Sequence, residues 1–376
     1  MRIQAFELER FFAKYEFTAP YLLGSSDCES LNVAQLLALE PGSETGLSGC
    51  WLGYTESKGH PLLREEIANL YTRCDREQIL VHSGAEEAIF IFMNVMLTPG
   101  DHVIVQSPCY QSLFQIANDL GCQVTRWNPR EENPWHWDLT DLEESITPET
   151  KLVIINQPHN PTGHLMTHKQ QEQLIALVKK HELLLFSDEV YRCLEHDPAL
   201  RLPAACDLYE RAVSLGVMSK TYGLAGLRIG WIATRDKVIF DAMATFKDYT
   251  SICNSAPSEY LSLIALRNQQ QLIDRNLKIV DANLQALNQF FSSHAHLFKW
   301  EAPAAGSIAF PAYLGKGGAH QLATDLVEQK GVLIIPSGYF NYGDQHFRIG
   351  LGRKNLTECL AHMNEYLEEN RETLKP

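Results

Sequence analysis

The chain has 376 residues, 45% of them hydrophobic and 21% charged, and its formal net charge is −14 at pH 7. This length is enough for two domains with sizeable cores, and the acidic balance argues against nucleic acids or anionic membranes as the main binding partners. The nine cysteines show no CxxC spacing, which favours a reducing compartment over a disulfide framework.

The amino-terminal stretch lacks the apolar core of a signal peptide, and no apolar run reaches the ~18 residues that a membrane span needs, so we expect a cytoplasmic protein. From residue 45 to 262, strand-like runs alternate with helical patterns, as the βαβ units of an α/β fold require. The sequence predicts a large domain over residues 45–262. Residues 1–44 and 263–376, with a long helical pattern over 262–291, are expected to form a smaller domain. Residues 128–138 are expected to form a surface loop.

An apolar run over residues 79–82 leads into the turn Ser83-Gly84-Ala85-Glu86 and then into a helical pattern. The first N–H groups of a helix have no partner within the helix and point outward with the positive end of the helix dipole. The turn therefore predicts a phosphate site.

Two further strand-like runs end in polar residues that can reach a ligand. The run 152–155 breaks into a segment with two prolines and a glycine, and Asn160 before Pro161 is pushed to an extended conformation that can project its amide. The run 183–186 has the length of a buried parallel strand and delivers Asp188 at its carboxyl end. Open α/β sheets bind their ligands at this end.

A fourth run, over residues 213–218, is followed by Ser219-Lys220 and a glycine-spaced stretch over 221–230. Burying an ammonium group costs several kcal/mol unless it is paired or neutralised. A desolvated lysine with a lowered pKa is the form that condenses with a carbonyl. Lys220 is therefore the candidate Schiff-base lysine, although on this run alone a strand end with a solvated lysine is the more common interpretation.

These strand ends together provide what pyridoxal phosphate requires. The cofactor needs a lysine for its aldehyde, an acid at the ring nitrogen, donors to the phenolic oxygen and a cradle for its phosphate. Lys220, Asp188 and the turn 83–86 match three of these roles, and Asn160 with Tyr191 matches the remaining one.

Four motifs resemble those of the fold-type I, class I/II aminotransferase family, in the same order and spacing over nearly the whole chain. They are Asn160-Pro161-Thr162-Gly163, Ser187-Asp188-Glu189-Val190-Tyr191, the stretch Ser219 to Gly230, and Phe347-Arg348-Ile349-Gly350. The resemblance implies a fold-type I transferase that depends on pyridoxal 5'-phosphate. Its large α/β domain would hold a mostly parallel central sheet, and both termini would form the smaller α+β domain.

Carried over residue by residue, the resemblance assigns roles around the ring of the cofactor. Lys220 would form the aldimine and move the α-proton, and Asp188 would pair with the pyridinium nitrogen. Tyr110 would stack on the ring face. Asn160 and Tyr191 would bond the ring oxygen.

The phosphate ligands that the resemblance implies are the backbone N–H groups of Gly84, Ala85 and Glu86 and, as a charge-assisted pair, the guanidinium of Arg228. Two residues depart from the family pattern. Val217 stands where the family often has a serine, so one phosphate hydrogen bond is missing or is replaced, with Ser219 as the candidate. The carboxylate of Glu86 would repel the phosphate unless its side chain points away.

The resemblance also implies the substrates and the assembly. Arg348, with Asn160 beside it, would bind the α-carboxylate of an amino acid and of a 2-oxo acid. Tyr54 resembles the family's tyrosine that reaches the phosphate of the neighbouring subunit, which implies a homodimer with shared active sites. No metal site is predicted: His164 and His168 lack a third ligand, and Thr167 is better explained as a helix N-cap.

The reaction is less determined than the cofactor, because transamination, β-elimination and intramolecular replacement all begin when Lys220 removes the α-proton. An aminotransferase of the EC 2.6.1 type is the leading interpretation, and a lyase or cyclase is the alternative. Residues 6–16 and 23–30 resemble, more faintly, the subgroup that contains capreomycidine synthase, which cyclises a hydroxylated arginine. On that resemblance Asp27 or Glu29 would receive a cationic side chain.

Two other possibilities are disfavoured. Residues 247–254 show no second arginine for a distal carboxylate, which argues against a dicarboxylate substrate. A non-catalytic binding protein with the same fold is opposed by the joint presence of all the motif residues.

Overall fold

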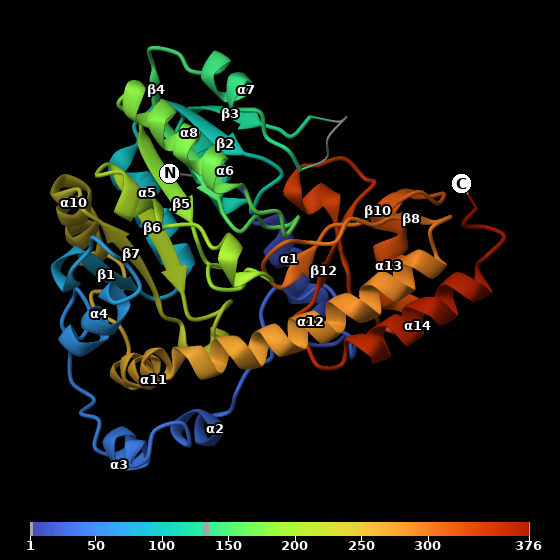
Figure 1. The fold of residues 1–376 in the computed structure, drawn as a ribbon, viewed down its shortest axis with the longest axis horizontal. Helices are drawn as coiled ribbons and strands as arrows, with labels where there is room; N and C mark the ends of the chain where they lie inside the picture. Colours follow the sequence, from blue (N-terminus) through green and yellow to red (C-terminus); the bar gives the residue numbers. More distant parts are fainter. Residues whose placement is uncertain (1–2, 131–134, 376) are drawn as a thin grey trace.

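A seven-stranded sheet forms the core of one part of the molecule, shown at the left of Figure 1. The computed structural model describes residues 3–130 and 135–375. The strand order is β1-β7-β6-β5-β4-β2-β3. The strands are β1 (Ile79–His82), β2 (His102–Gln106), β3 (Gln123–Trp127), β4 (Thr150–Asn156), β5 (Leu184–Asp188), β6 (Ala212–Val217) and β7 (Gly230–Thr234). Because β7 alone is antiparallel to its two neighbours, β1 points the same way as β2, β4, β5 and β6.

Helices cover both faces of this sheet, which is why its strands are almost continuous apolar runs. Successive residues point to opposite faces: Val103 and Val105 of β2 pack in one hydrophobic cluster, and Ile104 between them packs in another. The first cluster includes α5 (Ala85–Met96), α6 (Ser112–Asp119) and α10 (Lys237–Lys247). The second includes α7 (Leu139–Glu144), α8 (His168–Lys180) and α9 (Ala205–Leu208).

The carboxyl-terminal part, in orange and red at the right of Figure 1, has smaller sheets and a hydrophobic core of its own. One sheet has the order β11-β12-β9 and the other pairs β10 with β8. The elements are β8 (Phe298–Lys299), β9 (Ile308–Ala309), β10 (Ala312–Tyr313), α13 (Gly318–Lys330), β11 (Ile335–Pro336), β12 (Phe347–Gly350) and α14 (Leu356–Glu369).

The predicted helix over 262–291 is two helices, α11 (Ala256–Arg267) and α12 (Gln269–Ser293), so the expectation of one continuous helix is wrong at Asn268. This residue leaves the helical conformation, and its side-chain amide donates to the carbonyl of Ile264 at 2.9 Å. By contrast, Thr167 caps α8 as predicted.

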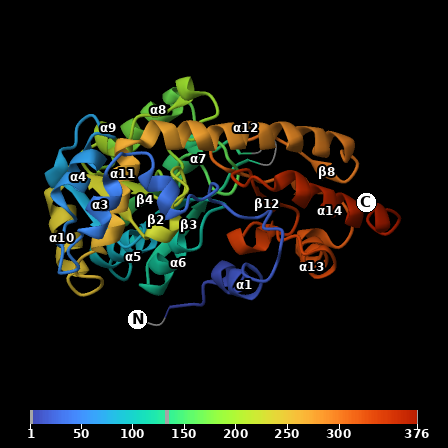
Figure 2. The same ribbon diagram turned by 90° about the horizontal axis from the view of Figure 1, so that it is seen from below.

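α12 runs along both parts of the molecule, as Figure 2 shows from below. Leu272 and Ile273 pack with the sheet-containing part, whereas Val280 and Leu287 pack in the carboxyl-terminal core. One helix thus contributes to two cores, and the domain boundaries at residues 45 and 263 stay a prediction. Within the described ranges, no helix combines the length and the apolar character that a membrane crossing requires.

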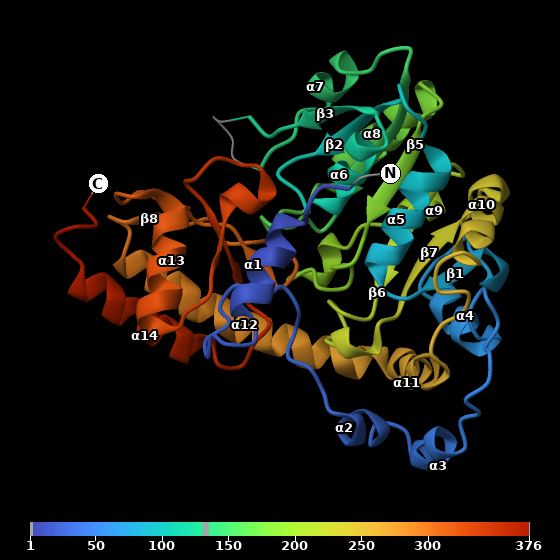
Figure 3. The same cartoon turned by 180° about the vertical axis from the view of Figure 1, so that it is seen from behind.

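In the amino-terminal segment, α1 (Glu7–Tyr15) lies between the two parts (Figures 1 and 3). The helices α2 (Val33–Leu37), α3 (Ser43–Ser48) and α4 (Pro61–Ala68) follow, and each contacts α11. The side-chain amide of Gln111 fixes the start of α1, because it donates a hydrogen bond to the carbonyl of Ala5 and accepts one from the N–H of Glu7, each at 2.9 Å. On the other side, the Phe11 ring lies 4.8 Å from the ring of Tyr339.

The expectation of a surface loop over residues 128–138 is wrong for its two tryptophans. Trp135 and Trp137 are buried, and the indole N–H of Trp137 donates to the carbonyl of Ser107 at 2.9 Å. Residues 131–134 of this loop lie outside the described residues.

Candidate active site

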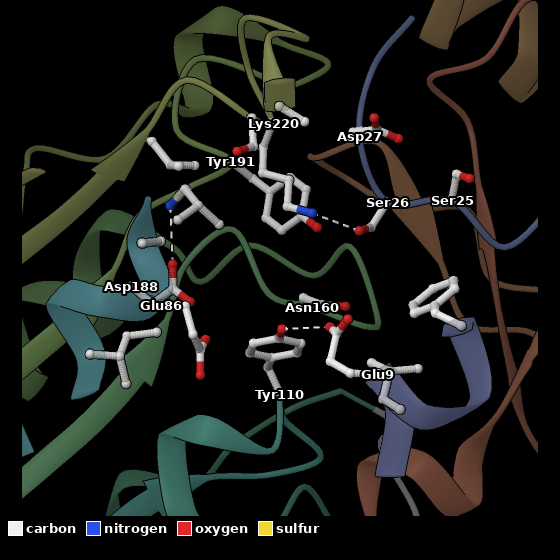
Figure 4. A pocket seen from close by; sticks show the side chains of 18 of the residues that line it. Glu9, Ser25, Ser26, Asp27, Glu86, Tyr110, Asn160, Asp188, Tyr191 and Lys220 are labelled. Carbon is white, nitrogen blue, oxygen red and sulfur yellow. Dashed lines mark hydrogen bonds between the residues drawn. The ribbon is translucent and has the colours of Figure 1, made fainter. Parts of the chain in front are cut away.

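A cavity of about 400 Å³ opens where the parallel strands of the central sheet end (Figure 4). Its first side, the cofactor wall, is formed by Ala85, Glu86, Tyr110, Asn160, Asp188, Tyr191, Ser219, Lys220 and Arg228. Its second side, the amino-terminal wall, is formed by Leu8, Glu9, Phe12, Glu16, Ser25, Ser26 and Asp27. Arg348 of β12 also lines the cavity. The fold therefore brings together all the predicted site residues except Gly84, which adjoins the cavity, Tyr54 and Glu29.

The cofactor wall follows directly from the direction of the strands. Ala85, Tyr110 and Asn160 follow β1, β2 and β4, while Asp188 ends β5 and Lys220 follows β6. Because these strands point the same way, their carboxyl ends meet at one edge of the sheet. Residues that are far apart in the sequence thereby face one cavity.

Lys220 is partly buried, and its Nζ donates to Oγ of Ser26 at 2.7 Å. The Nζ lies 6.0 Å from the centre of the Tyr191 ring. Burial lowers the pKa of Lys220, although the charge of Asp27 opposes the shift. The neutral, nucleophilic amine is thus more accessible at physiological pH than in a solvated lysine.

Asp188 is 6% exposed, and burial raises the pKa of its carboxyl group to about 7, against the N–H of Val190 and the charge of Lys220. The Val190 N–H donates to Oδ1 at 3.2 Å. A cationic partner in the cavity would favour the carboxylate and reverse this shift. The buried Asp188 carboxyl group thus suits a positively charged group in the cavity.

Two glycines let the start of α5 approach Arg228 and β7. Gly84 precedes the helix with φ of +91°, and a Cβ on it would lie 2.6 Å from Nη2 of Arg228. A Cβ on Gly230 would lie 2.7 Å from the backbone nitrogen of Ala85. The helix N-terminus and a guanidinium therefore come together, and both favour an anion.

The condition that the Glu86 side chain point away from the site, under which its carboxylate would not repel a phosphate, is not met. The side chain stands with those around the cavity, on the same side as Asp188 (Figure 4). Burial raises the pKa of Glu86 to about 7, and the charges of Glu9 and Asp188 act in the same direction. Partial protonation near neutral pH weakens the repulsion that its carboxylate would exert on an anion.

Arg348 is 1% exposed, and only two of its three guanidinium nitrogens make hydrogen bonds with the described residues. Nη1 donates to Oδ1 of Asn160 at 3.3 Å and Nη2 to the carbonyl of Gly24 at 3.0 Å. Its Nε and the hydroxyl of buried Tyr191 have no hydrogen-bond partner among the described residues. Buried polar groups of this kind are normally satisfied, so they indicate that the cavity holds a ligand.

Glu9, Glu16 and Ser26 are site residues that the sequence interpretation missed. The Tyr110 hydroxyl donates to Oε1 of Glu9 at 2.9 Å. A signal was available, because Glu9, Phe12 and Glu16 have the spacing of one face of a helix. What that face contacts depends on where α1 packs.

Tyr54 lies outside this cavity. It is 82% exposed and lines a second cavity of about 500 Å³ together with Trp51. Of the two acids predicted near a cationic side chain, Asp27 lines the active-site cavity, whereas Glu29 is not part of its lining and accepts from the N–H of Lys354 at 3.1 Å.

Comparisons with known proteins agree with this arrangement. The family model of aminotransferase class I and II matches residues 21–362. The chain belongs to this family. Capreomycidine synthase of Streptomyces vinaceus is 28% identical to it over 370 residues, which cover 97% of this chain and 94% of the synthase.

This aminotransferase-family chain is also similar to solved structures. A PLP-dependent aminotransferase from Streptococcus suis 89-1591 is 31% identical, has a TM-score of 0.93 and covers all of both chains. The PLP-dependent cyclase OrfR is 26% identical, has a TM-score of 0.90 and covers 98% of each chain. The fold is fold-type I, as predicted, and pyridoxal 5'-phosphate is the cofactor. The glycine-lined helix start, the buried Asp188 and the unpartnered Tyr191 hydroxyl fit this cofactor.

Proposed function

We propose that the enzyme is an aminotransferase that moves an amino group between an L-amino acid and a 2-oxo acid. The observation that carries the proposal is the convergence of Lys220, Asp188 and Arg348 on one cavity. These are the amine, the acid and the carboxylate-binding group that the reaction requires. The likeness to the Streptococcus suis aminotransferase over the whole chain supports it.

The chain's own residues would divide the work as follows. When bound, pyridoxal phosphate supplies an electron sink for the charge that develops at the substrate α-carbon. Lys220 would hold the cofactor covalently and, once the substrate amino group has displaced it, would take the α-proton on Nζ. Asp188 would keep the ring nitrogen protonated, which strengthens the sink.

The remaining residues would orient the cofactor. Backbone N–H groups of Gly84, Ala85 and Glu86 and the guanidinium of Arg228 would bind the phosphate, with Ser219 in place of the ligand that is lost at Val217. Tyr110 would cover one ring face, and Asn160 and Tyr191 would bond the ring oxygen.

Arg348 would bind the substrate α-carboxylate. Its contact with the Asn160 amide, at 3.3 Å, positions the guanidinium at the edge of the ring site, and burial excludes competing water. Burial strengthens such a charge-assisted hydrogen bond. Asn160 would thus serve both the cofactor and the substrate.

A lyase or cyclase is the second candidate, and one finding favours it. Capreomycidine synthase and the cyclase OrfR are similar to this chain over almost its entire length. Both reaction types need the same proton removal by Lys220, and they diverge only afterwards. The residues of the cofactor wall are therefore the same for the two candidates.

The deciding experiment incubates the holoenzyme with a panel of L-amino acids, with and without a 2-oxo acid. Transamination converts the cofactor to pyridoxamine phosphate and releases a 2-oxo acid in a stoichiometric half-reaction. Elimination releases ammonia, and cyclisation gives a new amino-acid product with the cofactor unchanged. Either of the last two outcomes, without pyridoxamine phosphate, contradicts the aminotransferase proposal.

We further propose that the enzyme is a homodimer whose active sites are shared. Trp51, Leu52 and Tyr54 are 78%, 80% and 82% exposed, and neighbouring exposed apolar side chains are typical of an interaction surface. In a dimer, Tyr54 would reach the phosphate of the neighbouring subunit.

A further inference from the structure

The Nζ of Lys220 has a single hydrogen-bond partner among the described residues, and that partner lies on the opposite wall of the cavity. It is Ser26, whose Oγ accepts from Nζ at 2.7 Å. Figure 4 shows the lysine side chain extending toward Ser26, with the Tyr191 ring beside it. Burial raises the pKa of Tyr191, and the charge of Arg348 and the hydroxyl of Ser26 oppose this shift. Ser26 thus lies beside both the reactive amine and the Tyr191 hydroxyl.

The segment around Ser26 is fixed by its own backbone contacts with the carboxyl-terminal part. The Ser307 hydroxyl donates to the carbonyl of Ser26 at 2.9 Å, and the N–H of Gly350 donates to the carbonyl of Leu23 at 2.6 Å. A Cβ on Gly350 would lie 1.8 Å from the carbonyl oxygen of Ser25, so this close approach requires a glycine. The Ser26 hydroxyl is therefore held in place independently of Lys220.

A neutral hydroxyl can orient an amine without keeping it protonated. A carboxylate bonded to Nζ would strongly favour the ammonium form, which cannot take up a further proton. The adjacent acid, Asp27, forms an ion pair with Arg353 at 2.9 Å, which reduces the effect of its charge on Lys220. Burial lowers the pKa of Lys220 even though the charge of Asp27 opposes the shift. The contact with Ser26 is thus compatible with a lysine that acts as a base.

We propose that Ser26 is a positioning residue for Lys220, and that its hydroxyl holds Nζ at the place from which it takes the α-proton. The inference rests on the proposed function only in that Lys220 removes this proton, a step that the aminotransferase and the lyase or cyclase share. Once the substrate amino group has displaced Lys220, its Nζ is a free amine at the end of a flexible side chain. A hydrogen bond to a fixed hydroxyl restricts that amine, and a misplacement of about 1 Å can cost ~10²-fold in rate.

Exchange of the α-proton with solvent tests this role, because it reports proton removal whatever step follows. The holoenzyme is incubated in D₂O with each amino acid of the panel, and proton NMR follows the loss of the α-proton signal. We expect Ser26→Ala to slow the exchange by about 10–100-fold, with little change in cofactor occupancy or in the half-saturating amino-acid concentration. Ser26→Thr keeps the hydroxyl and should restore most of the rate. Ser293→Ala, at the exposed end of α12, is the matched control.

A second measurement uses the apoprotein and needs no turnover. Absorbance follows the rate of imine formation with pyridoxal as a function of pH, with the signal of Lys220→Ala subtracted, so the midpoint reports the pKa of Lys220. The hydrogen bond from Nζ to Ser26 modestly favours the ammonium form. We therefore expect Ser26→Ala to lower the midpoint by about 0.5–1 pH unit and Ser26→Thr to restore it. The other charged groups that act on Lys220 are unaltered in both variants: Asp27, Asp188, Glu9, Glu16 and Arg348.

Failure of this inference and failure of the proposed function give different results. Exchange at the normal rate in Ser26→Ala, or an unshifted midpoint, would overturn the proposal. Slow exchange together with loss of the cofactor would also overturn it, because Ser26 would then have a structural role. Absence of exchange in the unaltered enzyme with every amino acid would instead contradict the role of Lys220 itself. Formation of pyridoxamine phosphate decides independently whether the enzyme is an aminotransferase.

Discussion

The two walls of the active-site cavity are built in different ways. The cofactor wall consists of residues at the ends of strands in one sheet, and its geometry follows from the strand direction. The amino-terminal wall comes from α1 and residues 25–27, and its place depends on how that segment packs between the two parts of the molecule. The proposed cofactor chemistry thus depends on the sheet. The amino-terminal wall comes from a separate segment, and its Ser26 and Glu9 contact Lys220 and Tyr110 of the cofactor wall.

The strongest test of this division is Lys220→Ala on the cofactor wall. Turnover should fall by at least about 10²–10⁴-fold for every substrate, because in the proposed function this residue holds the cofactor and moves the proton. Borohydride reduction followed by peptide mapping should place a phosphopyridoxyl group on Lys220 in the unaltered enzyme. Lys180→Ala, on the surface of α8, is the control. A label on any other lysine contradicts the assignment.

The second test, Asp188→Asn, separates catalysis from anchoring on the cofactor wall. Asparagine keeps the acceptor for the Val190 N–H but cannot stabilise a charged ring nitrogen. We expect a loss of about 10²–10³-fold in kcat, as for other electrostatic contacts to a reacting centre, and a much smaller change in cofactor occupancy. Equal losses of rate and occupancy would mean that Asp188 mainly anchors the ring.

The charge of Asp188 also predicts how the cofactor-free protein responds to pH. Burial raises the pKa of Asp188 to about 7 in the folded chain, whereas in the unfolded chain the same carboxyl group titrates near the ordinary aspartate pKa. Between these two pKa values, the folded chain therefore binds more protons than the unfolded chain. The contribution of Asp188 to stability is full below the lower value and declines as pH rises, by at most about 1.4 kcal/mol per pH unit.

Denaturant unfolding of the apoprotein from pH 4 to 8 measures this effect. The stability difference between Asp188→Asn and the unaltered chain should shift in favour of the variant as pH rises. A difference that is constant over the whole range would show that the carboxyl group has no raised pKa.

Tyr54 tests whether the cofactor wall is complete within one chain. If Tyr54 reaches the phosphate of the neighbouring subunit, Tyr54→Phe removes one hydrogen bond to a charged oxygen, worth about 1.5–3 kcal/mol, and cofactor affinity should fall by roughly one to two decades. The control mixes inactive Lys220→Ala with a severely impaired Tyr54 variant, because shared sites leave one site of the heterodimer without either lesion. Activity should return on mixing; no recovery after proven subunit exchange would mean that each chain completes its own site.

Glu87 provides the smallest expected effect and tests what holds the phosphate turn. Its carboxylate accepts from the N–H of Ser83 at 2.6 Å and, on the other oxygen, from the Thr250 hydroxyl at 2.7 Å and the N–H of Ser251 at 3.2 Å. Although burial alone would raise the pKa of Glu87, the His82 ring and these donors hold it well below its usual range.

In Glu87→Gln, the side-chain NH₂ group would face the N–H and hydroxyl donors that now bond the carboxylate, so the turn loses hydrogen bonds. We expect cofactor affinity to fall by about tenfold, with little change in kcat at saturation. Equilibrium dialysis of the cofactor measures the affinity, with Glu172→Gln as the control. An unchanged affinity would show that the turn keeps its shape without this carboxylate.

The sequence by itself determined the cofactor wall to a large extent. Asp188, Asn160 and Lys220 each follow an apolar run, and the helix start at Ala85 follows another, so strand periodicity and strand direction were enough to bring them to one edge. The run 79–82 matches β1, and the run 213–218 lies within one residue of β6 at each end. Such local patterns are reliable because burial on both faces of a parallel strand leaves little freedom of composition.

Only the tertiary structure decided the amino-terminal wall and the interruption at Asn268. Glu9 and Glu16 show a helical face in the sequence, but which surface that face meets depends on contacts with Gln111 and Tyr339, more than one hundred residues away in the chain. Trp135 and Trp137 were likewise assigned to the surface, and distant partners bury them. Local periodicity reports which residues share a face, whereas the packing of distant segments determines what that face contacts.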